Sequence, residues 1–215
     1  MQIAKGGISW IVIAIVFFLI FGLGSFIATD SIQRIFLFIS IISGLFAILF
    51  LVFFRDPKRI IGEGIVAVAD GIIRKKDTIN DKDIGPAWFI STFMNLYHVH
   101  VNRMPIDGTI KKITHIPGSH LPAFTKESDR NERVIILVDT NQGPVKIVLI
   151  AGTLARRIVP YVNEGDKVRK GEKISLIRLG SRVDIYLSER MNVKLQISEK
   201  KRVKAGVSVL ATSNV

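Results

Sequence analysis

A glycine–serine step, Gly180-Ser181, is the feature of this sequence with the clearest chemical potential. It stands between two strand-like runs, where such a step often serves only to make a turn. A serine after glycine can also attack the carbonyl carbon of the residue before it, because glycine has no side chain to obstruct a strained backbone. Self-cleaving proteins depend on this reaction. The step therefore indicates either an ordinary turn or a self-cleavage site.

Four histidines are the next candidates: His98, His100, His115 and His120. His98 and His100 lie two residues apart in a strand-like run, so with Asn102 they would share one face of a sheet. Metal binding by this pair is disfavoured, because no Glu or Cys follows at a useful spacing. A polar strand face is the alternative, and we expect no metal site.

Asp70 and a pair of arginines complete the candidates. Asp70 precedes Gly71 at the end of a predicted strand, a pattern typical of a turn aspartate. Arg156 and Arg157 follow Ile150-Ala151-Gly152, a predicted strand that enters a turn of small residues. Paired arginines can clamp a phosphate, although a solvated basic turn gives the same pattern.

Two uncharged runs near the N-terminus predict a transmembrane hairpin. One has 24 residues, from Gly6 to Thr29, and the other has 20, from Ile35 to Phe54. A helix needs about 20 apolar residues to cross the bilayer core. Lys5 before the first run and Arg55 after the second predict that both ends, and the domain that follows, lie on the cytoplasmic side of the cell membrane.

The remaining 161 residues, 55–215, carry 28 of the 30 Lys and Arg and 17 of the 18 Asp and Glu, a net charge of +11. That length is sufficient for one hydrophobic core. The charge favours an anionic membrane surface, at about 1 kcal/mol per well-placed cation. Nucleic acid is not expected as a partner, because no nucleic-acid-binding motif is present. The absence of cysteine excludes disulfides, thiol nucleophiles and cysteine-ligated zinc.

Short β-rich runs separated by Gly, Pro, Asn or Asp fill this second part, and helical periodicity never persists beyond about two turns. The pattern predicts a mainly β fold, with a compact β-barrel or sandwich after the two-helix hairpin. Segments 165–174 and 201–209 share a Val-x-x-Gly pattern that looks like the corners of biotinyl and lipoyl carrier domains, although glycine alone permits such corners. Examples of the predicted strands are Ile65–Ala69, Trp88–Phe93, Tyr97–Val101, Val134–Val138, Val145–Ile150, Lys173–Ile177 and Val183–Leu187.

Nine short motifs, in order from about Phe53 to the C-terminus, carry a family resemblance. They are Phe53-Phe54-Arg55-Asp56-Pro57, Ala69-Asp70-Gly71, Val99-His100-Val101-Asn102-Arg103 with Pro105 and Asp107-Gly108, Pro117-Gly118, Asn131-Glu132-Arg133, Ile150-Ala151-Gly152, Ala155-Arg156-Arg157-Ile158, Gly165-Asp166 with Val168 and Gly171-Glu172, and Arg178 with Gly180-Ser181-Arg182-Val183-Asp184. Together they closely resemble the short form of phosphatidylserine decarboxylase, including its archaeal relative, archaetidylserine decarboxylase. The predicted hairpin agrees with that family.

The resemblance implies a pyruvoyl-dependent enzyme that is made from a proenzyme. Ser181 would attack the Gly180 carbonyl, and the chain would separate into a large chain, Met1–Gly180, and a small chain, Ser181–Val215. The small chain would begin with a pyruvoyl group, a covalent cofactor derived from Ser181. This group would form a Schiff base with the substrate's serine amine and accept the electrons released with CO₂. The implied reaction converts the serine headgroup of a phospholipid, phosphatidylserine or archaetidylserine, to ethanolamine.

The resemblance also implies roles for other residues. His100 and Asp70 would activate Ser181, as in a Ser-His-Asp arrangement that is recognised by geometry. His98 is not expected to be catalytic. Three arginines are expected to bind the substrate's carboxylate or phosphate, with structural salt bridges as the alternative: Arg103, Arg157 and Arg182.

Two other functions stay open at this point. A membrane-anchored, non-enzymatic adaptor with a biotinyl/lipoyl-like barrel would explain the hairpin and the corners, but not the Gly180-Ser181 step. A pyruvoyl enzyme for a soluble amino acid would have no need of an anchor. We expect the lipid decarboxylase, divided into an anchor, 1–54, and a catalytic domain, 55–215. The sequence is compatible with a homo-oligomer and with either acyl-ester or isoprenoid-ether lipids.

Overall fold

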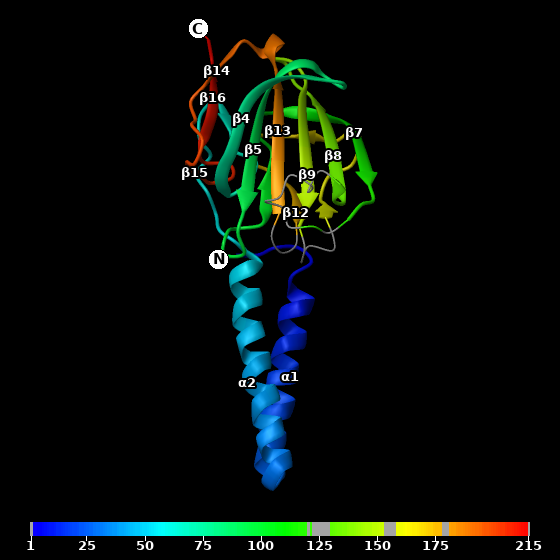
Figure 1. The fold of residues 1–215 in the computed structure, drawn as a ribbon, viewed down its shortest axis with the longest axis vertical. Helices are drawn as coiled ribbons and strands as arrows, with labels where there is room; N and C mark the ends of the chain where they lie inside the picture. Colours follow the sequence, from blue (N-terminus) through cyan, green and yellow to red (C-terminus); the bar gives the residue numbers. More distant parts are fainter. Residues whose placement is uncertain (1, 120, 122–129, 153–157, 178–180, 215) are drawn as a thin grey trace. The chain divides into compact units, whose positions relative to one another are not determined.

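The computed structural model describes residues 2–119, 121, 130–152, 158–177 and 181–214. The chain forms two compact units, Met1–Lys58 and Arg59–Val215. The first unit is helical, and the second consists mainly of β-strands (Figure 1). The mainly β prediction is therefore confirmed.

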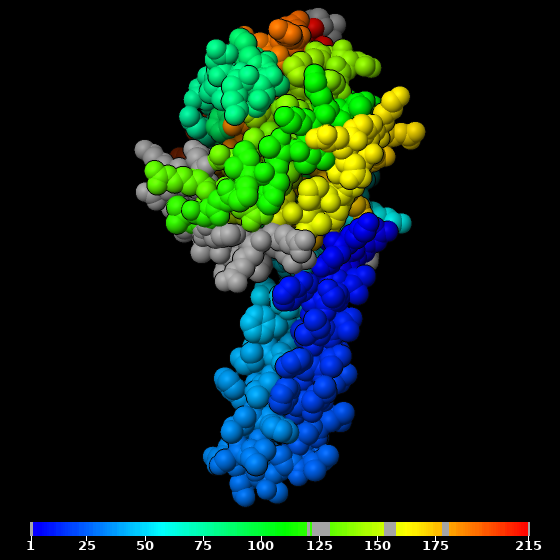
Figure 2. Space-filling model, turned by 90° about the vertical axis from the view of Figure 1, so that its right-hand side faces the viewer, coloured from blue at the N-terminus to red at the C-terminus, as the bar shows by residue number. Residues whose placement is uncertain are grey.

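Two long helices make up the first unit and pack side by side (Figure 2). Small residues allow this close packing, since a Cβ atom on Gly24 would lie only 2.8 Å from the ring of Phe36. Both helices are long and apolar enough to cross a membrane, with mean hydropathies of 2.7 and 2.9. The second helix begins earlier than the predicted apolar run and includes Arg34. The elements of this unit are β1 (Gln2–Ile3), α1 (Ile8–Ile27), α2 (Asp30–Phe53) and β2 (Arg55–Asp56), and β1 pairs with β2.

The second unit is built on a curled eight-stranded sheet with the order β11-β7-β8-β9-β13-β5-β4-β15 (Figure 1). All neighbouring strands pair antiparallel. The sheet is an open half-barrel with edges at β11 and β15, where the sequence had predicted a barrel or sandwich. Its strands are β4 (Gly71–Asp81), β5 (Gly85–Met94), β7 (Gly108–Ile116), β8 (Arg133–Asp139), β9 (Val145–Ala151), β11 (Lys167–Val168), β13 (Ser181–Ser188) and β15 (Arg202–Val203).

Two three-stranded sheets complete the unit. The first has the order β10 (Ile158–Pro160), β12 (Lys173–Ile177) and β6 (Val101–Arg103), and the second has the order β14 (Val193–Leu195), β16 (Val209–Ser213) and β3 (Ile65–Val66). A short 3₁₀ helix, η2 (Glu189–Met191), follows β13. The main core lies between one face of the large sheet and β12. The sheet contributes residues such as Leu149 and Ile185, and β12 contributes Ile177. Each such side chain contributes about 1.5–3 kcal/mol when fully buried.

Most predicted strands are present, but the one predicted at Tyr97–Val101 is wrong. Residues 96–98 form a turn, and β6 begins only at Val101. The turn is closed by a hydrogen bond from the Asn95 amide to His98 Nδ1, at 2.9 Å. Strand β4 was missed because most of its side chains are polar and exposed, so it lacks an apolar alternation.

The two glycine corners predicted from the Val-x-x-Gly pattern are present and lie close together. Gly171 and Gly206 have φ angles of +84° and +73°, which favour glycine. The Arg103 side chain contacts both corners. Its Nη1 donates to the Gly171 carbonyl at 2.9 Å, and a Cβ atom on Gly206 would lie 3.0 Å from its Cδ. Arg103 thus ties the two corners to β6.

Candidate active site

Ser181 is the first residue of β13 and is fully buried. It pairs with Met94 of β5 on one side and with Ala151 of β9 on the other. Its hydroxyl donates to the Met94 sulfur at 3.3 Å, a weak hydrogen bond. The serine oxygen therefore lies in an apolar environment, which excludes competing water. Gly180 lies outside the described residues.

His100 is fully buried and comes directly before β6. Its Nδ1 lies 2.8 Å from the carbonyl oxygen of His98. Its own carbonyl accepts a hydrogen bond from the Ile177 amide at 3.2 Å, so the β6–β12 ladder extends to His100. His100 therefore pairs with the last residue of β12, Ile177, and the next described strand, β13, begins at Ser181 in the large sheet.

The pairing pattern places His100 and Ser181 toward the same core. In an antiparallel ladder, paired residues share a face, so His100 lies on the side of Ile177, a member of the main core. Ser181 shares its face with Met94 and Ala151, which belong to the same core. Both side chains therefore face the interior between the large sheet and β12. Serine and histidine are residue types that take part in proton transfer in enzymes.

Asn102 lies on the same face as His100. Its Nδ2 donates to Ser175 Oγ at 2.9 Å, and both side chains are fully buried. Its Oδ1 has no hydrogen-bond partner within the described part of the chain. A buried acceptor of this kind is costly and is often retained at a functional site.

Asp70 is nearly buried, with 8% of its surface exposed. Its carboxylate accepts hydrogen bonds from Arg59 at 2.5 and 2.9 Å and from the Ala205 amide at 2.7 Å. The Val66 amide donates to the Pro105 carbonyl, and the Arg103 amide donates to the Val68 carbonyl. These bonds place the segment that leads to Asp70 beside β6, in the direction of His100. Asp70 is thus near the His100 segment in the backbone, but its described hydrogen bonds do not include His100.

His98 differs from His100 in both burial and contacts. It is only half buried, and its Nδ1 accepts the turn-closing hydrogen bond from the Asn95 amide. Its ring packs against Tyr97, with 4.5 Å between ring centroids. The two histidines therefore do not share one strand face as the sequence predicted.

Two of the three predicted arginines lie in the described part of the chain, and these two occupy different parts of the fold. Arg103 is buried, with 7% of its surface exposed, and holds the glycine corners. Arg157 lies outside the described residues. Arg182 follows Ser181 on β13 and therefore points to the opposite face of the large sheet. There its Nε and Nη2 donate to Asp184 Oδ2 at 3.2 and 2.9 Å.

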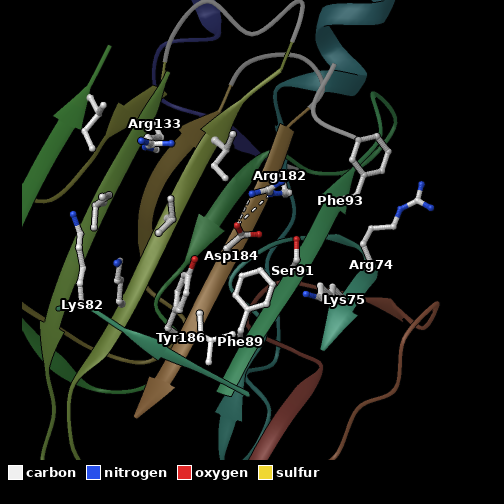
Figure 3. Close-up of a pocket in the computed structure, with 16 residues that line it drawn as sticks. Arg74, Lys75, Lys82, Phe89, Ser91, Phe93, Arg133, Arg182, Asp184 and Tyr186 are labelled. Atoms are coloured by element: carbon white, nitrogen blue, oxygen red, sulfur yellow. Dashed lines mark hydrogen bonds and ion pairs between the residues drawn. The ribbon is translucent and has the colours of Figure 1, made fainter. Parts of the chain in front are cut away.

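This opposite face carries a groove with a volume of about 1050 Å³, which we call the outer groove (Figure 3). Figure 3 shows the Arg182–Asp184 pair in its middle, with Phe89 and Tyr186 below it on neighbouring strands. The groove is lined by Arg74, Lys75, Ile79, Lys82, Phe89, Ser91, Phe93, Ile116, Arg133, Ile135, Lys146, Val148, Ile150, Arg182, Asp184 and Tyr186. The candidate active site and the outer groove thus lie on the two faces of one sheet.

Asn131 is a buried residue at the site whose role the sequence did not reveal. Its side-chain amide donates to the Ala151 carbonyl at 2.8 Å and to the Leu121 carbonyl at 2.6 Å, and its Oδ1 accepts from the Leu121 amide at 2.8 Å. Ala151 is the partner of Ser181. Asn131 therefore braces the strand end beside Ser181. The only sequence signal was its place in the motif Asn131-Glu132-Arg133, because the neighbouring residues do not predict hydrogen bonds to Leu121 and Ala151.

No group of three histidine, aspartate or glutamate side chains suited to a metal ion occurs among the described residues. The described site thus combines a buried serine, which opens a strand and follows a glycine in the sequence, with a buried histidine directed toward the same core.

Comparisons with known proteins place the chain in a family. The sequence model of the family described as phosphatidylserine decarboxylase matches residues 46–211. A phosphatidylserine decarboxylase proenzyme of Streptomyces avermitilis is 46% identical over 149 residues, which cover 69% of this chain and 67% of the relative. A protein of Methanosarcina acetivorans with the provisional name archaetidylserine decarboxylase proenzyme is 40% identical over 215 residues, 98% of this chain and 97% of the relative. A protein of Methanococcoides burtonii with the same provisional name is 36% identical, over 98% of this chain and 96% of its own length.

The chain belongs to the phosphatidylserine decarboxylase family, a family of carboxy-lyases. The family resemblance seen in the nine motifs is confirmed. The relatives' description as proenzymes agrees with a processing step.

Proposed function

We propose that this chain is a proenzyme that cleaves itself between Gly180 and Ser181 and then decarboxylates the serine headgroup of a membrane phospholipid. The observation that carries the proposal is the buried Ser181 at the start of β13, facing the same core as His100. Family membership supports the decarboxylase activity.

In the proposed cleavage, the Ser181 hydroxyl attacks the carbonyl carbon of Gly180, and the peptide bond is exchanged for an ester. His100 accepts the hydroxyl proton as general base. Elimination then releases the chain ending at Gly180 and leaves dehydroalanine at position 181, and water converts this residue to a pyruvoyl group with loss of ammonia. The apolar contact of Ser181 with Met94 supports this order, because it keeps water away until the ester has formed.

The residues present fit a pyruvoyl group at position 181. The group is uncharged and about as large as serine, so it suits a buried position between Met94 and Ala151. Its carbonyl supplies an electron sink for the pair of electrons left when CO₂ departs. The chain's own contribution is a fixed position on β13, a water-poor interior, and the His100 imidazole, which can hold the proton that replaces the carboxylate.

We propose that Asp70 acts on processing by positioning the segment that carries His100. Its carboxylate is held by Arg59 and the Ala205 amide, while its backbone runs beside β6. Asp70 would thus hold the backbone segment beside β6 in place, and through it the position of the His100 side chain relative to Ser181, without contacting His100 itself.

We further propose that α1 and α2 anchor the enzyme in the membrane, with the β unit on the cytoplasmic side. Their length and hydropathy support the anchor, and the basic residues that flank them support the orientation. Among the predicted substrate-binding arginines, Arg157 remains a proposal. The position of Arg182 on the sheet face opposite to the Ser181 hydroxyl disfavours its binding the same substrate. The buried bond from Arg103 to Gly171 favours a structural role for Arg103.

Intact mass spectrometry of the purified protein tests the proposal. We expect two chains, 1–180 and 181–215, the smaller one without a free α-amine, and release of CO₂ from phosphatidylserine or archaetidylserine vesicles. Ser181→Ala should give one intact, inactive chain. A single intact chain that is active, or an intact and inactive wild-type chain, would contradict the proposal, and the latter result would favour a non-enzymatic adaptor.

A further inference from the structure

We propose that the outer groove binds one anionic phospholipid molecule, at a site separate from Ser181. This inference goes beyond the proposed decarboxylation, because the groove lies on the sheet face opposite to the Ser181 hydroxyl. Alternation along β13 separates the two, with Arg182, Asp184 and Tyr186 in the groove and Val183 in the core.

The floor of the groove is apolar. Val148 and Ile150 of β9 are almost fully buried there, and Phe89 packs against Tyr186 with 5.1 Å between ring centroids. The volume of about 1050 Å³ lies near the upper end of the roughly 300–1000 Å³ that is typical of ligand pockets. The floor therefore offers a single molecule a surface for hydrocarbon.

The charged side chains of the groove are unbalanced. Six lining residues are cationic and one, Asp184, is anionic. Four carboxylates lie beside these cations: Asp184 with Arg182, Asp77 with Lys75, and Asp81 and Asp83 with Lys146. Asp83 also interacts electrostatically with Lys82. Arg74 has no carboxylate partner among the described residues and lies over the ring of Phe93, 5.0 Å from its centroid. The groove therefore keeps positive charge beside its apolar floor.

This combination selects an anionic amphiphile. A small inorganic anion would use the cations but not the aromatic floor, and a neutral lipid would use the floor but not the cations. A second copy of the same face would bring like charges together, which disfavours a symmetric contact. A phospholipid with a net negative headgroup satisfies both features, with its phosphate near Arg74 and its hydrocarbon on Phe89.

Photolabelling of the full chain in neutral detergent tests the site. The probe is a short-chain phosphatidylglycerol with a diazirine in its acyl chain, and labelled residues are mapped by peptide mass spectrometry. The test variant is Arg74→Gln. The control variant is Lys201→Gln, which removes the same charge from an exposed position outside the groove.

We expect labelling of outer-face residues on β5 and β13, and roughly 5-fold weaker probe affinity in the test variant, since one cation contributes about 1 kcal/mol near an anionic headgroup. The control variant should bind as the parent does, and the matching phosphatidylcholine probe should label the groove weakly. Equal losses in both variants, or labelling confined to α1 and α2, would overturn the inference. So would protection of the groove in a dimer detected by light scattering, which would assign it to a second copy.

Cleavage at Gly180-Ser181 is measured in the same samples. A cleaved, active parent without label in the groove would overturn this inference alone. An uncleaved parent with a labelled groove would contradict the proposed function alone.

Discussion

The ion pair between Arg59 and Asp70 should be among the strongest single contributions to the stability of the β unit. Arg59 donates two hydrogen bonds to Asp70 and one, at 2.7 Å, to the Ala205 carbonyl, and its side chain is only 6% exposed. Removing one partner of such a buried pair typically costs about 3–5 kcal/mol, because the other charge is left without compensation. For a domain of this size, that corresponds to a fall in Tm of roughly 6–20 °C. Arg59→Gln should show this fall.

The assay is thermal unfolding of the full chain in the Ser181→Ala background, so that cleavage does not alter the species observed. Lys111→Gln is the control, because its pair with Asp139 is exposed and such pairs contribute about 0–1 kcal/mol. The double variant Arg59→Gln/Asp70→Asn should be less destabilised than the sum of the single variants, since it leaves no unpaired charge. Additive losses, or a fall no larger than that of the control, would refute the coupling.

Three further predictions follow from the site and the groove. His100→Ala should slow self-cleavage by a factor of about 10² to 10⁴, whereas His98→Asn should mature almost normally because an Asn oxygen can also accept the turn-closing bond; cleaved fraction against time after cell-free synthesis measures both, and the reverse order would show that the wrong histidine was chosen. Asn131→Ala should slow cleavage while leaving a folded protein, since it releases the Ala151 strand end beside Ser181; circular dichroism is the control, and normal cleavage would remove Asn131 from the site. The hydrogen bond from Lys146 lowers the pKa of Asp83 below its ordinary value of 3.8, so the stabilisation is complete above about pH 4 and is lost as the pH falls toward the lowered pKa. Asp83→Asn should therefore flatten the acid limb of a plot of Tm against pH, and an unchanged limb would contradict this cause.

The sequence predicted the strand position of Ser181 better than the contacts of the residues around it. A glycine before a serine between two strand-like runs is a local signal, and Ser181 does open a strand. The partners of Asp70 are not local, because Arg59 lies 11 residues earlier and Ala205 lies 135 residues later. Nothing in either segment identifies the other, so only the packed fold reveals this contact.

Two errors concern the alternation of side chains along a strand, which was assumed where the chain turns and overlooked where the chain is extended. His98 and His100 were placed on one face because the run looked extended, but the turn closed by Asn95 breaks the alternation between them. Conversely, Ser181 and Arg182 were assigned to one site, although neighbours on a strand face opposite sides. The second error was avoidable from the sequence, whereas the first depended on a side-chain hydrogen bond.

The position of the proposed cleavage within the sheets explains how two chains could act as one enzyme. The segment after Ser181 supplies β13, which pairs along its length with β5 and β9 in the middle of the large sheet. The same segment supplies β14 and β16 to one small sheet and β15 to an edge of the large one. Separation of a chain 181–215 would therefore break ladders in two sheets and expose core residues such as Val183 and Leu187. Cleavage between Gly180 and Ser181 frees a strand end without freeing the strand, so residue 181 keeps the position in the sheet that the proposed chemistry requires.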